Sequence, residues 1–362
     1  MPETALAPTT IYSARPVIEV ARRRPDIVQQ LLRAMDLREA EGGLSSLELR
    51  FLNVATHERG GVDFAFEHSE TDLFALGTAI RVLAGDEGDP MEIFSGEISA
   101  VELVFEEDGQ PQLCIHAEDA LMGQRMRRFT RTHPAGPLRD ILEDLALETG
   151  LTPSVRGLTN RVDSQIQLNE TNLAFMRRLL ADYDADMQVV GDALHIARRG
   201  DVQRGRVTVA VGGQLNRVRL CADLADQVTS VTHAGFDVGQ GRPVSAESTR
   251  IDLGPGSGRS GSEVLREVFG RRAEHLGDRA VHNQAEADAL VAAAHARRAR
   301  RFVTVEGTCE GNPALRVGTH VTIEGVGPRF ENTYYVTGVC HRFDRSVGYK
   351  TDFTAECGHF GG

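Results

Sequence analysis

The sequence predicts an α+β protein that is mainly β, with one β-module present twice and an α/β insert between the copies. The clearest β signal is residues 314–353, where β-branched and aromatic residues are separated by turns rich in Gly, Pro, Asn and Asp. Similar sequence occurs earlier: Leu76–Val82 resembles Val317–Ile323, which places Gly77 241 residues before Gly318. A repeat at this distance indicates two copies of one module rather than a solenoid with a short period.

The repeat continues into the next strand of each copy. Phe94–Ile98 is similar to Phe330–Tyr334, and in both places a hairpin and a further strand follow. We therefore expect an antiparallel meander in each copy, with Phe94 and Phe330 at equivalent positions. Short alternating strands of this kind are typical of a small antiparallel barrel or sandwich.

The first module is expected to follow a loose N-terminal arm, Met1–Ser13. Apolar residues four positions apart in Pro25–Leu37 predict an amphipathic helix that ends before a Gly-Gly pair. Leu47–Phe51 alternates apolar and polar residues, which predicts a half-buried strand. A turn at Glu106–Pro111, followed by alternation over 113–117, predicts a hairpin with its return strand.

The middle of the chain changes to helical periodicity. Leu138–Ala146 places apolar residues on one helix face, and Gly150 ends this helix. Thr171 is expected to cap a second helix that buries its apolar face. The dipeptide Gly191-Asp192 then joins two short strands as a hairpin. These elements predict a compact α/β insert.

The expected boundaries follow from these elements. Residues 1–130 form the first β-module, 131–200 the α/β insert and 201–362 the second β-module. Within the second module, a glycine-rich loop and a helix at about 254–301 are expected as an insertion. This helix is Ala-rich, and its charged face is expected to be solvated or to face another subunit.

The glycine-rich loop contains a G-x-G-x-x-G pattern at Gly256, Gly258 and Gly261. A dinucleotide site would need this pattern inside a β-α-β unit, with an acidic residue about 20 positions later to bind the ribose. Polar, Arg-rich sequence follows instead. The pattern therefore predicts a surface loop, whose role the sequence leaves open.

Neither metal nor cofactor chemistry is expected. Cys340-His341 and Cys357-x-His359 are zinc-like ligand types, but adjacent residues on a strand face opposite sides and cannot easily share one ion. Common hydrolase, P-loop and zinc-protease motifs are absent. A glycosidase would need two carboxylates across a cleft, and solvated surface acids are commoner. The acidic residues near the first repeat and after the second insert helix are Glu97, Glu102, Glu118, Asp119, Asp182, Asp184 and Asp186.

Composition restricts the function further. The chain has 362 residues and a net charge of −12, which argues against sequence-independent or specific nucleic-acid binding. Arg-rich runs at 127–131 and 297–301 are interpreted as solvated faces or subunit salt links. Five cysteines without framework spacing predict reduced thiols and synthesis in the cytoplasm. We find neither a secretory leader nor an apolar run long enough to span a membrane.

Four segments, read in order, carry a resemblance to a known family. They are Ile93–Ile98, Ala117–Thr130, Glu170–Leu194 and Gly318–Thr337. Together they make the region Leu44–Phe353 similar to the phage late control D proteins and to the hub portion of the VgrG proteins of contractile injection machines. No single segment is diagnostic, but their order and spacing are specific. The glycine-rich loop and the Arg-rich helix do not match the family pattern.

The resemblance implies a trimeric baseplate hub whose two modules are β-barrels like that of the inner tube protein. Three chains would then present six barrels to a six-fold tube, which is a symmetry match made by closed cyclic contacts. VgrG chains continue into an OB-like domain and a long β-prism, whereas this sequence stops at Gly362. The resemblance therefore favours a separate spike polypeptide and no spike-borne effector activity.

We accordingly expect a structural protein without an active site. Its expected partners are two further copies of itself, the inner tube protein, a separate spike and other baseplate proteins, in a phage tail or injection particle. The alternatives are a tail-associated cell-wall hydrolase and a carbohydrate adhesin, the latter weakened by the absence of Trp. Residues expected either at such interfaces or in the barrel cores are Phe64, Phe66, Phe330, Tyr334 and Tyr335.

Overall fold

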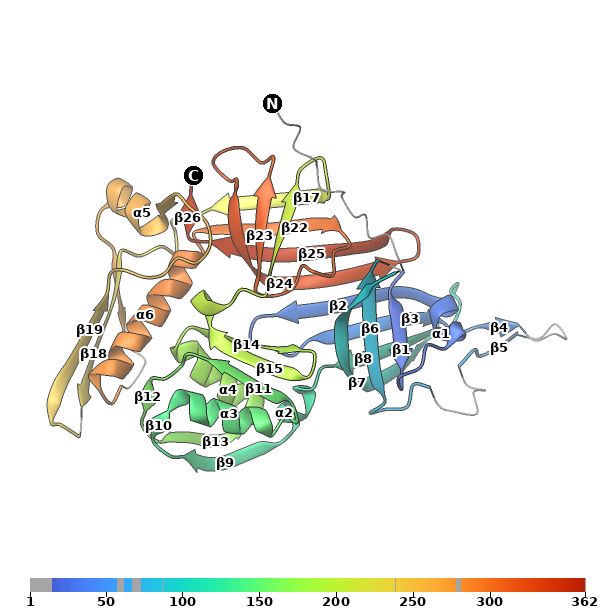
Figure 1. The fold of residues 1–362 in the computed structure, drawn as a ribbon, viewed down its shortest axis with the longest axis horizontal. Helices are drawn as coiled ribbons and strands as arrows, with labels where there is room; N and C mark the ends of the chain where they lie inside the picture. Colours follow the sequence, from blue (N-terminus) through green and yellow to red (C-terminus); the bar gives the residue numbers. More distant parts are fainter. Residues whose placement is uncertain are drawn as a thin grey trace.

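The structure, a computed structural model, describes residues 15–56, 62–66, 73–86, 88–237, 239–277 and 281–361. One large curled sheet dominates it, an α/β lobe lies below this sheet in Figure 1, and a wing of strands and helices flanks it on the left. The mainly β class expected from the sequence is confirmed. The arm expected at Met1–Ser13 falls outside the described residues.

The twelve strands of the large sheet fall into two sets with one plan. In sheet order, the first set is β1 (Val17–Val20), β6 (Ala79–Gly85), β7 (Pro90–Val104), β8 (Gln112–Glu118), β3 (Ser46–Leu52) and β2 (Leu32–Ala40). The second set, in the same order, is β16 (Gly205–Ala210), β23 (Thr319–Glu324), β24 (Asn332–Asp344), β25 (Gly348–Cys357), β22 (Val303–Glu310) and β17 (Leu215–Ala222). The first strands differ, because β1 is antiparallel to β6 whereas β16 is parallel to β23.

The turn before β6 recurs before β23. Gly77 has φ of 82° and donates its N–H to the carbonyl of Ile98 at 2.8 Å. Gly318 has φ of 85° and donates to the carbonyl of Val336 at 2.9 Å. A positive φ favours glycine, which explains why the sequence repeat is clearest at these two positions. Ile98 and Val336 are therefore equivalent.

Irregularities in the strand pairing also recur. The register of β7 against β8 shifts between Ile98 and Ala100, and that of β24 against β25 shifts between Val336 and Gly338. A second matching pair of shifts occurs in β2 against β3 and in β17 against β22. Because a bulge re-aims a strand at a defined residue, these shared shifts fix the residue-by-residue equivalence of the two sets.

The expected equivalence of Phe94 with Phe330 was wrong by two residues. Val82 pairs with Phe94 across β6 and β7, and the equivalent Ile323 pairs with Asn332 across β23 and β24. Phe94 therefore corresponds to Asn332, and Phe330 lies in the turn before β24. The connection between the paired strands is shorter in the second copy, and matching residue types could not reveal this.

The helix expected at Pro25–Leu37 was also predicted too long. Helix α1 covers only Asp26–Leu31, and strand β2 begins at Leu32. The side chains of β2 alternate between buried and exposed, and both strand edges are paired, to β3 and to β24. Tertiary pairing has overridden a local pattern that also fits a helix.

Each set of strands curls around its own apolar core. Phe343 and Tyr349, which belong to the second set, pack into the core of the first. The first core includes Ile18, Leu37, Leu49, Phe51, Ile80 and Ile115. The second includes Val209, Val305, Val321, Tyr334, Val336 and Phe353. The shared aromatic contacts show that the two cores meet.

The α/β lobe matches the elements expected from the sequence. Helix α3 (Leu138–Leu147) and helix α4 (Asn172–Asp182) both form, and the side chain of Thr171 caps α4 by accepting from the Ala174 N–H at 3.1 Å. The hairpin at Gly191 joins β14 (Ala185–Val190) to β15 (Ala193–Arg198). The remaining elements are α2 (Met122–Met126), β9 (Arg128–His133), β10 (Gly136–Pro137), β11 (Thr152–Arg156), β12 (Arg161–Val162), β13 (Gln165–Thr171) and η1 (Arg199–Asp201).

The wing is larger than the insertion expected at 254–301. Strands β18 (Ser230–Asp237), β19 (Arg242–Ser248) and β21 (Ala273–Leu276) form a separate sheet, so the insertion occupies the whole connection between β17 and β22. Helix α6 (Gln284–Arg300) packs on this sheet, and α5 (Gly261–Phe269) precedes β21. Among the described residues, no helix is long and apolar enough to span a membrane. Short pairs complete the fold: β4 (Ala55–Thr56) with β5 (Val62–Asp63), and β20 (Arg259–Ser260) with β26 (His359–Phe360).

The glycine-rich loop attaches the wing to the second module. A Cβ at Gly256 would lie 2.7 Å from the Asn332 side chain, and one at Gly258 would lie 2.6 Å from a backbone oxygen of Gly361. Asn332 also accepts from the Ser257 N–H at 3.0 Å and donates to its carbonyl at 2.8 Å. The glycines therefore permit close backbone packing, which explains the G-x-G-x-x-G pattern without a phosphate.

The two equivalent turn glycines provide a test. Gly77→Ala places a Cβ in open space, so it should cost only the left-handed strain of about 1–2 kcal/mol. Gly318→Ala also brings its Cβ to 2.8 Å from Val202 Cγ1 and from Arg204 Nη1, and should lower the melting temperature by a clearly larger amount. Thermal unfolding of both variants measures the difference. Equal losses would contradict the described packing at Gly318.

Candidate functional site

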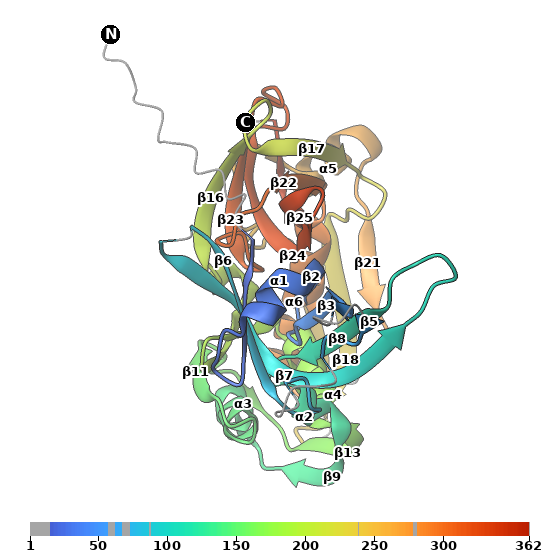
Figure 2. The same ribbon diagram turned by 90° about the vertical axis from the view of Figure 1, so that its right-hand side faces the viewer.

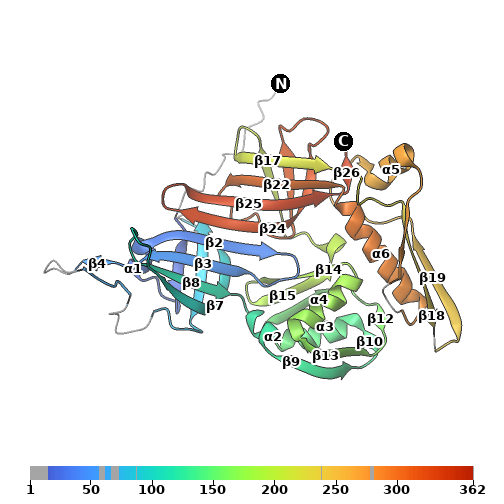
Figure 3. The same cartoon turned by 180° about the vertical axis from the view of Figure 1, so that it is seen from behind.

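The two modules join through their strand edges. β2 and β24 pair antiparallel over seven residue pairs, from Ala34 opposite Asp344 to Ala40 opposite Gly338. Figure 3 shows the resulting stack of strands, in the order β17, β22, β25, β24, β2, β3, β8 and β7. Backbone hydrogen bonds therefore run from one module into the other, and we call this pairing the internal joint.

A buried ion pair crosses the internal joint. Arg316, in the turn before β23, donates from Nε to the two carboxylate oxygens of Glu39 on β2, at 2.8 and 2.7 Å. The Glu39 side chain is only 3% exposed. Burial by itself would raise the pKa of Glu39, but the charge and hydrogen bonds of Arg316 lower it below its ordinary value. Glu39 is therefore an ionised group that ties one module to the other.

A second group of charges, the junction cluster, connects all parts of the chain. Arg199, at the end of the lobe, contacts Glu41 after β2 at 2.7 Å and Glu356 on β25 at 2.6 Å. Arg300, at the end of α6 in the wing, donates to Asp184 of the lobe at 2.7 Å. Both modules, the lobe and the wing thus meet at these five side chains.

The electrostatics of the junction cluster reflect its burial. Burial raises the pKa of Glu41 to about 7. The positive charge of Arg199 lowers this pKa, and the negative charges of Asp186 and Glu356 raise it. The guanidinium of Arg199 also lies 4.2 Å from the ring centroid of Tyr335. A shifted carboxyl pKa can mark a catalytic acid, but buried ion-pair networks shift pKa values too. The partners here are all charges that link structural parts.

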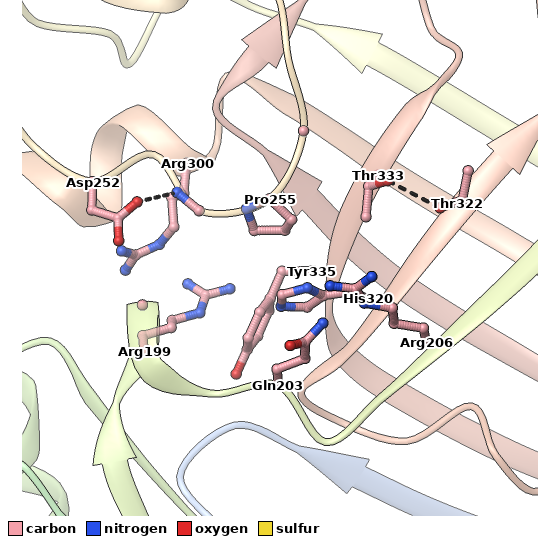
Figure 4. A pocket seen from close by; sticks show the side chains of 13 residues that line it. Arg199, Gln203, Arg206, Asp252, Pro255, Arg300, His320, Thr322, Thr333 and Tyr335 are labelled. Carbon is pink, nitrogen blue, oxygen red and sulfur yellow. Dashed lines mark hydrogen bonds between the residues drawn. The ribbon is translucent and has the colours of Figure 1, made fainter.

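A pocket of about 500 Å³ opens beside the junction cluster. Figure 4 shows Arg199, Arg300 and Tyr335 around this hollow, with Asp252 and Pro255 from the wing on one side. Among the described residues that line the pocket, Asp252 alone carries a carboxylate, and its Oδ1 accepts from the Gly254 N–H at 2.9 Å. Two facing carboxylates, which a glycosidase needs, are therefore not assembled in this pocket.

Most of the acidic residues singled out from the sequence are held in structural contacts outside the pocket, and Glu97 is exposed on β7. Glu118 binds Arg125 at 2.6 Å, and Asp119 accepts from the Ser45 and Leu121 N–H groups at 2.6 and 2.9 Å. Glu102 lies 3.6 Å from His116, and Asp186 binds Arg204 at 3.1 Å. These arrangements stabilise turns and strand ends, and none of these residues lines the pocket.

The residues considered as metal ligands are engaged in other ways. Cys340 faces Asp36, with its sulfur 3.8 Å from the carboxylate, whereas His341 is fully buried and hydrogen-bonded to the Tyr349 hydroxyl at 2.8 Å. Burial lowers the pKa of His341 to about 4, so the ring is neutral. Asp163, His282 and Glu286 bring ligand atoms within 4.8 Å of one another, but Asp163 and His282 are exposed.

The five aromatic residues expected at interfaces or in cores divide by burial. Tyr334 and Tyr335 are 1% and 2% exposed, so they belong to the interior of the chain, which was the alternative left open by the sequence. Phe64, Phe66 and Phe330 are half-buried. Phe64 contacts Phe105 edge to face, with ring centroids 6.0 Å apart. An interface role for the three phenylalanines stays a prediction.

Among the described strands of the large sheet, two long edges on the stack that carries the internal joint have no partner strand. β17 pairs only with β22, and the second half of β7 pairs only with β8. Figure 2 shows the β7–β8 hairpin projecting from the body. Val101, Leu103 and Phe105, on and just after β7, are 43%, 43% and 61% exposed. The sequence interpretation missed this surface, although the alternation of apolar residues at 101, 103 and 105 could have indicated it.

Three of the solved structures similar to this chain are proteins of tail or secretion assemblies. A 43 kDa tail protein of prophage MuSo2 from Shewanella oneidensis matches with a TM-score of 0.68 and 12% identity, over 94% of this chain and 97% of that one. An E. coli component of the type VI secretion system, described as similar to the T4 tail proteins gp27 and gp5, matches with a TM-score of 0.57 and 11% identity, over 93% and 76%. In a Francisella PdpA–VgrG complex the TM-score is 0.51 at 10% identity, over 94% and 57%.

The chain therefore shares its fold with phage tail proteins and with part of a VgrG complex, and the resemblance expected from the sequence is confirmed at the level of fold. A family model described as the Alg8 N-terminal domain matches residues 60–344. The chain belongs to this family. No curated protein matches it by sequence.

The ion pair at the internal joint predicts a pH-dependent stability. Arg316→Met leaves Glu39 buried without its counter-ion, which should cost about 3 kcal/mol or more at neutral pH. In the native chain the lowered pKa of Glu39 gives a stabilisation that is present near pH 7 and lost as the pH falls through that pKa. In the variant, burial raises the Glu39 pKa, so acidification relieves the cost. The difference in melting temperature should therefore narrow from pH 7 to pH 4.

The matched control is the double variant Glu39→Gln with Arg316→Met, which removes both charges. It should recover part of the lost stability at pH 7 and show no narrowing on acidification, because the buried carboxylate is gone. If the difference in melting temperature between the native chain and Arg316→Met stays constant with pH, Glu39 is not the group responsible.

Proposed function

We propose that this protein is the structural hub of a contractile phage tail or injection-system baseplate. In this role three copies form a ring that joins a hexameric inner tube to a separate trimeric spike, and other baseplate proteins bind around it. The observation that carries the proposal is the recurrence of one strand plan in two sets joined edge to edge. Three such chains would offer six similar modules, which is the number that a six-fold tube requires.

Rigid coupling within the chain supports a mechanical role. A hub must pass force from a contracting sheath to a spike, so its parts should not rotate freely. The internal joint, the ion pair of Arg316 with Glu39 and the junction cluster connect the modules, the lobe and the wing through buried or half-buried contacts. The continuous strand pairing and the apolar contacts of Phe343 and Tyr349 with the first core restrain the modules more than a flexible linker would.

The structural relatives agree with this proposal in kind. The proteins with this fold are described as tail proteins, as a type VI secretion component and as part of a VgrG complex. The separate spike is proposed from the sequence resemblance. A cell-wall hydrolase is a weaker proposal, because none of the acidic residues considered for it lines the pocket and the pocket offers a single carboxylate among its described lining residues.

Mass photometry of the purified chain, alone and with its tube protein, tests the proposed ring. We expect a species of three chains that becomes the dominant form when tube protein is added, because tube binding favours the closed ring by mass action. The same preparation should not release sugar or peptide fragments from cell walls. A single chain that stays monomeric with tube protein present, or clear cell-wall turnover, would contradict the proposal.

A further inference from the structure

The open edges of β17 and of the second half of β7 are equivalent to the two edges that form the internal joint. The shared bulges align Ala34 on β2 with Arg217 on β17, and Gly338 on β24 with Ala100 on β7. β2 and β24 already pair within the chain, whereas their counterparts β17 and β7 each keep a free edge. The fold thus contains one satisfied joint and the two separated halves of a second.

We infer that β17 of one copy pairs antiparallel with the second half of β7 of the next copy, in the register of the internal joint. The inference rests on the proposed function, since it specifies how the copies in the ring contact each other. The partner is a second copy of this chain, because the proposed pairing repeats the joint that the chain forms between its own two modules. Repeating the pairing around the ring leaves neither β17 nor the second half of β7 with a free edge.

The register follows residue by residue. Ala34 lies opposite Asp344 in the internal joint, so Arg217 of one copy lies opposite Glu106 of the next. In the same way Arg38 opposite Cys340 becomes Cys221 opposite Glu102. The other opposed pairs are Val218 with Phe105, Arg219 with Val104, Leu220 with Leu103, Ala222 with Val101 and Asp223 with Ala100.

The chemistry of these pairs is complementary. Val101, Leu103 and Phe105 are exposed in the single chain, but their counterparts Val339, His341 and Phe343 are 4%, 0% and 6% exposed at the internal joint. The opposed residues on β17 that share their face are Val218, Leu220 and Ala222, which border the second core. Pairing would therefore bury apolar side chains against apolar side chains, and would place Arg217 opposite the oppositely charged Glu106.

The two joints differ in one respect. The counterparts of Arg316 and Glu39 in the proposed joint are Ala75 and Ala222, so this ion pair has no equivalent between copies. The internal joint is thus stabilised by an additional buried ion pair, whereas the joint between copies would depend on backbone pairing and apolar burial. Contacts between copies are therefore expected to resist salt.

Cysteine cross-linking tests the register directly. Cys221 is exposed on β17, and Glu102→Cys would place a thiol opposite it in the next copy. Directly opposed residues of antiparallel strands have Cβ atoms close enough for a disulfide, whereas residues displaced by two positions do not. Cys114 lies directly opposite position 102 on β8 of the same chain, so all cysteine variants are made with Cys114→Ser. Mild oxidation of Glu102→Cys in this background should give covalent dimers and trimers on a non-reducing gel, and reductant should remove them.

Matched variants separate the outcomes. Glu102→Cys with Cys221→Ser should give no cross-link, and Ala100→Cys and Val104→Cys, on the same face but displaced by two residues, should give far less. If mass photometry shows trimers, but the cross-link forms through Ala100→Cys or Val104→Cys or through none of the three cysteine variants, the proposed register is wrong. The proposed hub function would still stand in that case. Protein that is monomeric with and without tube protein would overturn both proposals.

A second variant tests the apolar contact without a disulfide. Leu103→Asp should weaken association of the copies at least about tenfold, because it removes apolar burial worth more than about 1.4 kcal/mol. Val190→Asp is the control, since Val190 is similarly exposed, at 46%, on the lobe hairpin. Both variants should melt like the native single chain. Equal trimer formation by Leu103→Asp and native protein would contradict the proposed joint.

Discussion

The pairing of β2 with β24 is the constraint on which the architecture depends. A strand edge presents unpaired N–H and C=O groups, and leaving such an edge open in water invites association with another chain. Each set of strands has one edge like that of β2 and one edge like that of β24. Within one chain, only β2 and β24 pair with each other. This pairing fixes the orientation of the two modules. It also leaves β17 and the second half of β7, which are the counterparts of β2 and β24, with open edges in the single chain.

The inserted parts modify this plan without breaking it. The α/β lobe enters between the two sets, and the wing enters between β17 and β22, yet the bulges and turns of the two sets remain in register. The junction cluster explains how such large insertions stay fixed, because Arg199 and Arg300 bind carboxylates from both modules and from the lobe. Close packing of the glycine-rich loop on Asn332 adds a second attachment for the wing.

Sequence reasoning succeeded where local patterns and structure agree. The duplicated turn at Gly77 and Gly318, the alternation in Leu47–Phe51 and the cap at Thr171 were all readable, since each depends on conformational needs of nearby residues. It failed at Leu32, where pairing with distant strands decided between helix and strand, and at Phe330, where a shorter connection shifted the register. The buried joint between Arg316 and Glu39 spans 277 residues and left no local signal.

The central claim is that two modules in one chain act as neighbours in a ring of six. Cryo-EM of the chain bound to its tube tests this most directly, because it shows every module and every strand edge in place. The account predicts six modules spaced evenly around one axis, with the joint between copies repeating the residue register of β2 and β24. Modules that sit at unequal angles, or copies that touch through the lobe or wing while β17 and β7 stay unpaired, would contradict it.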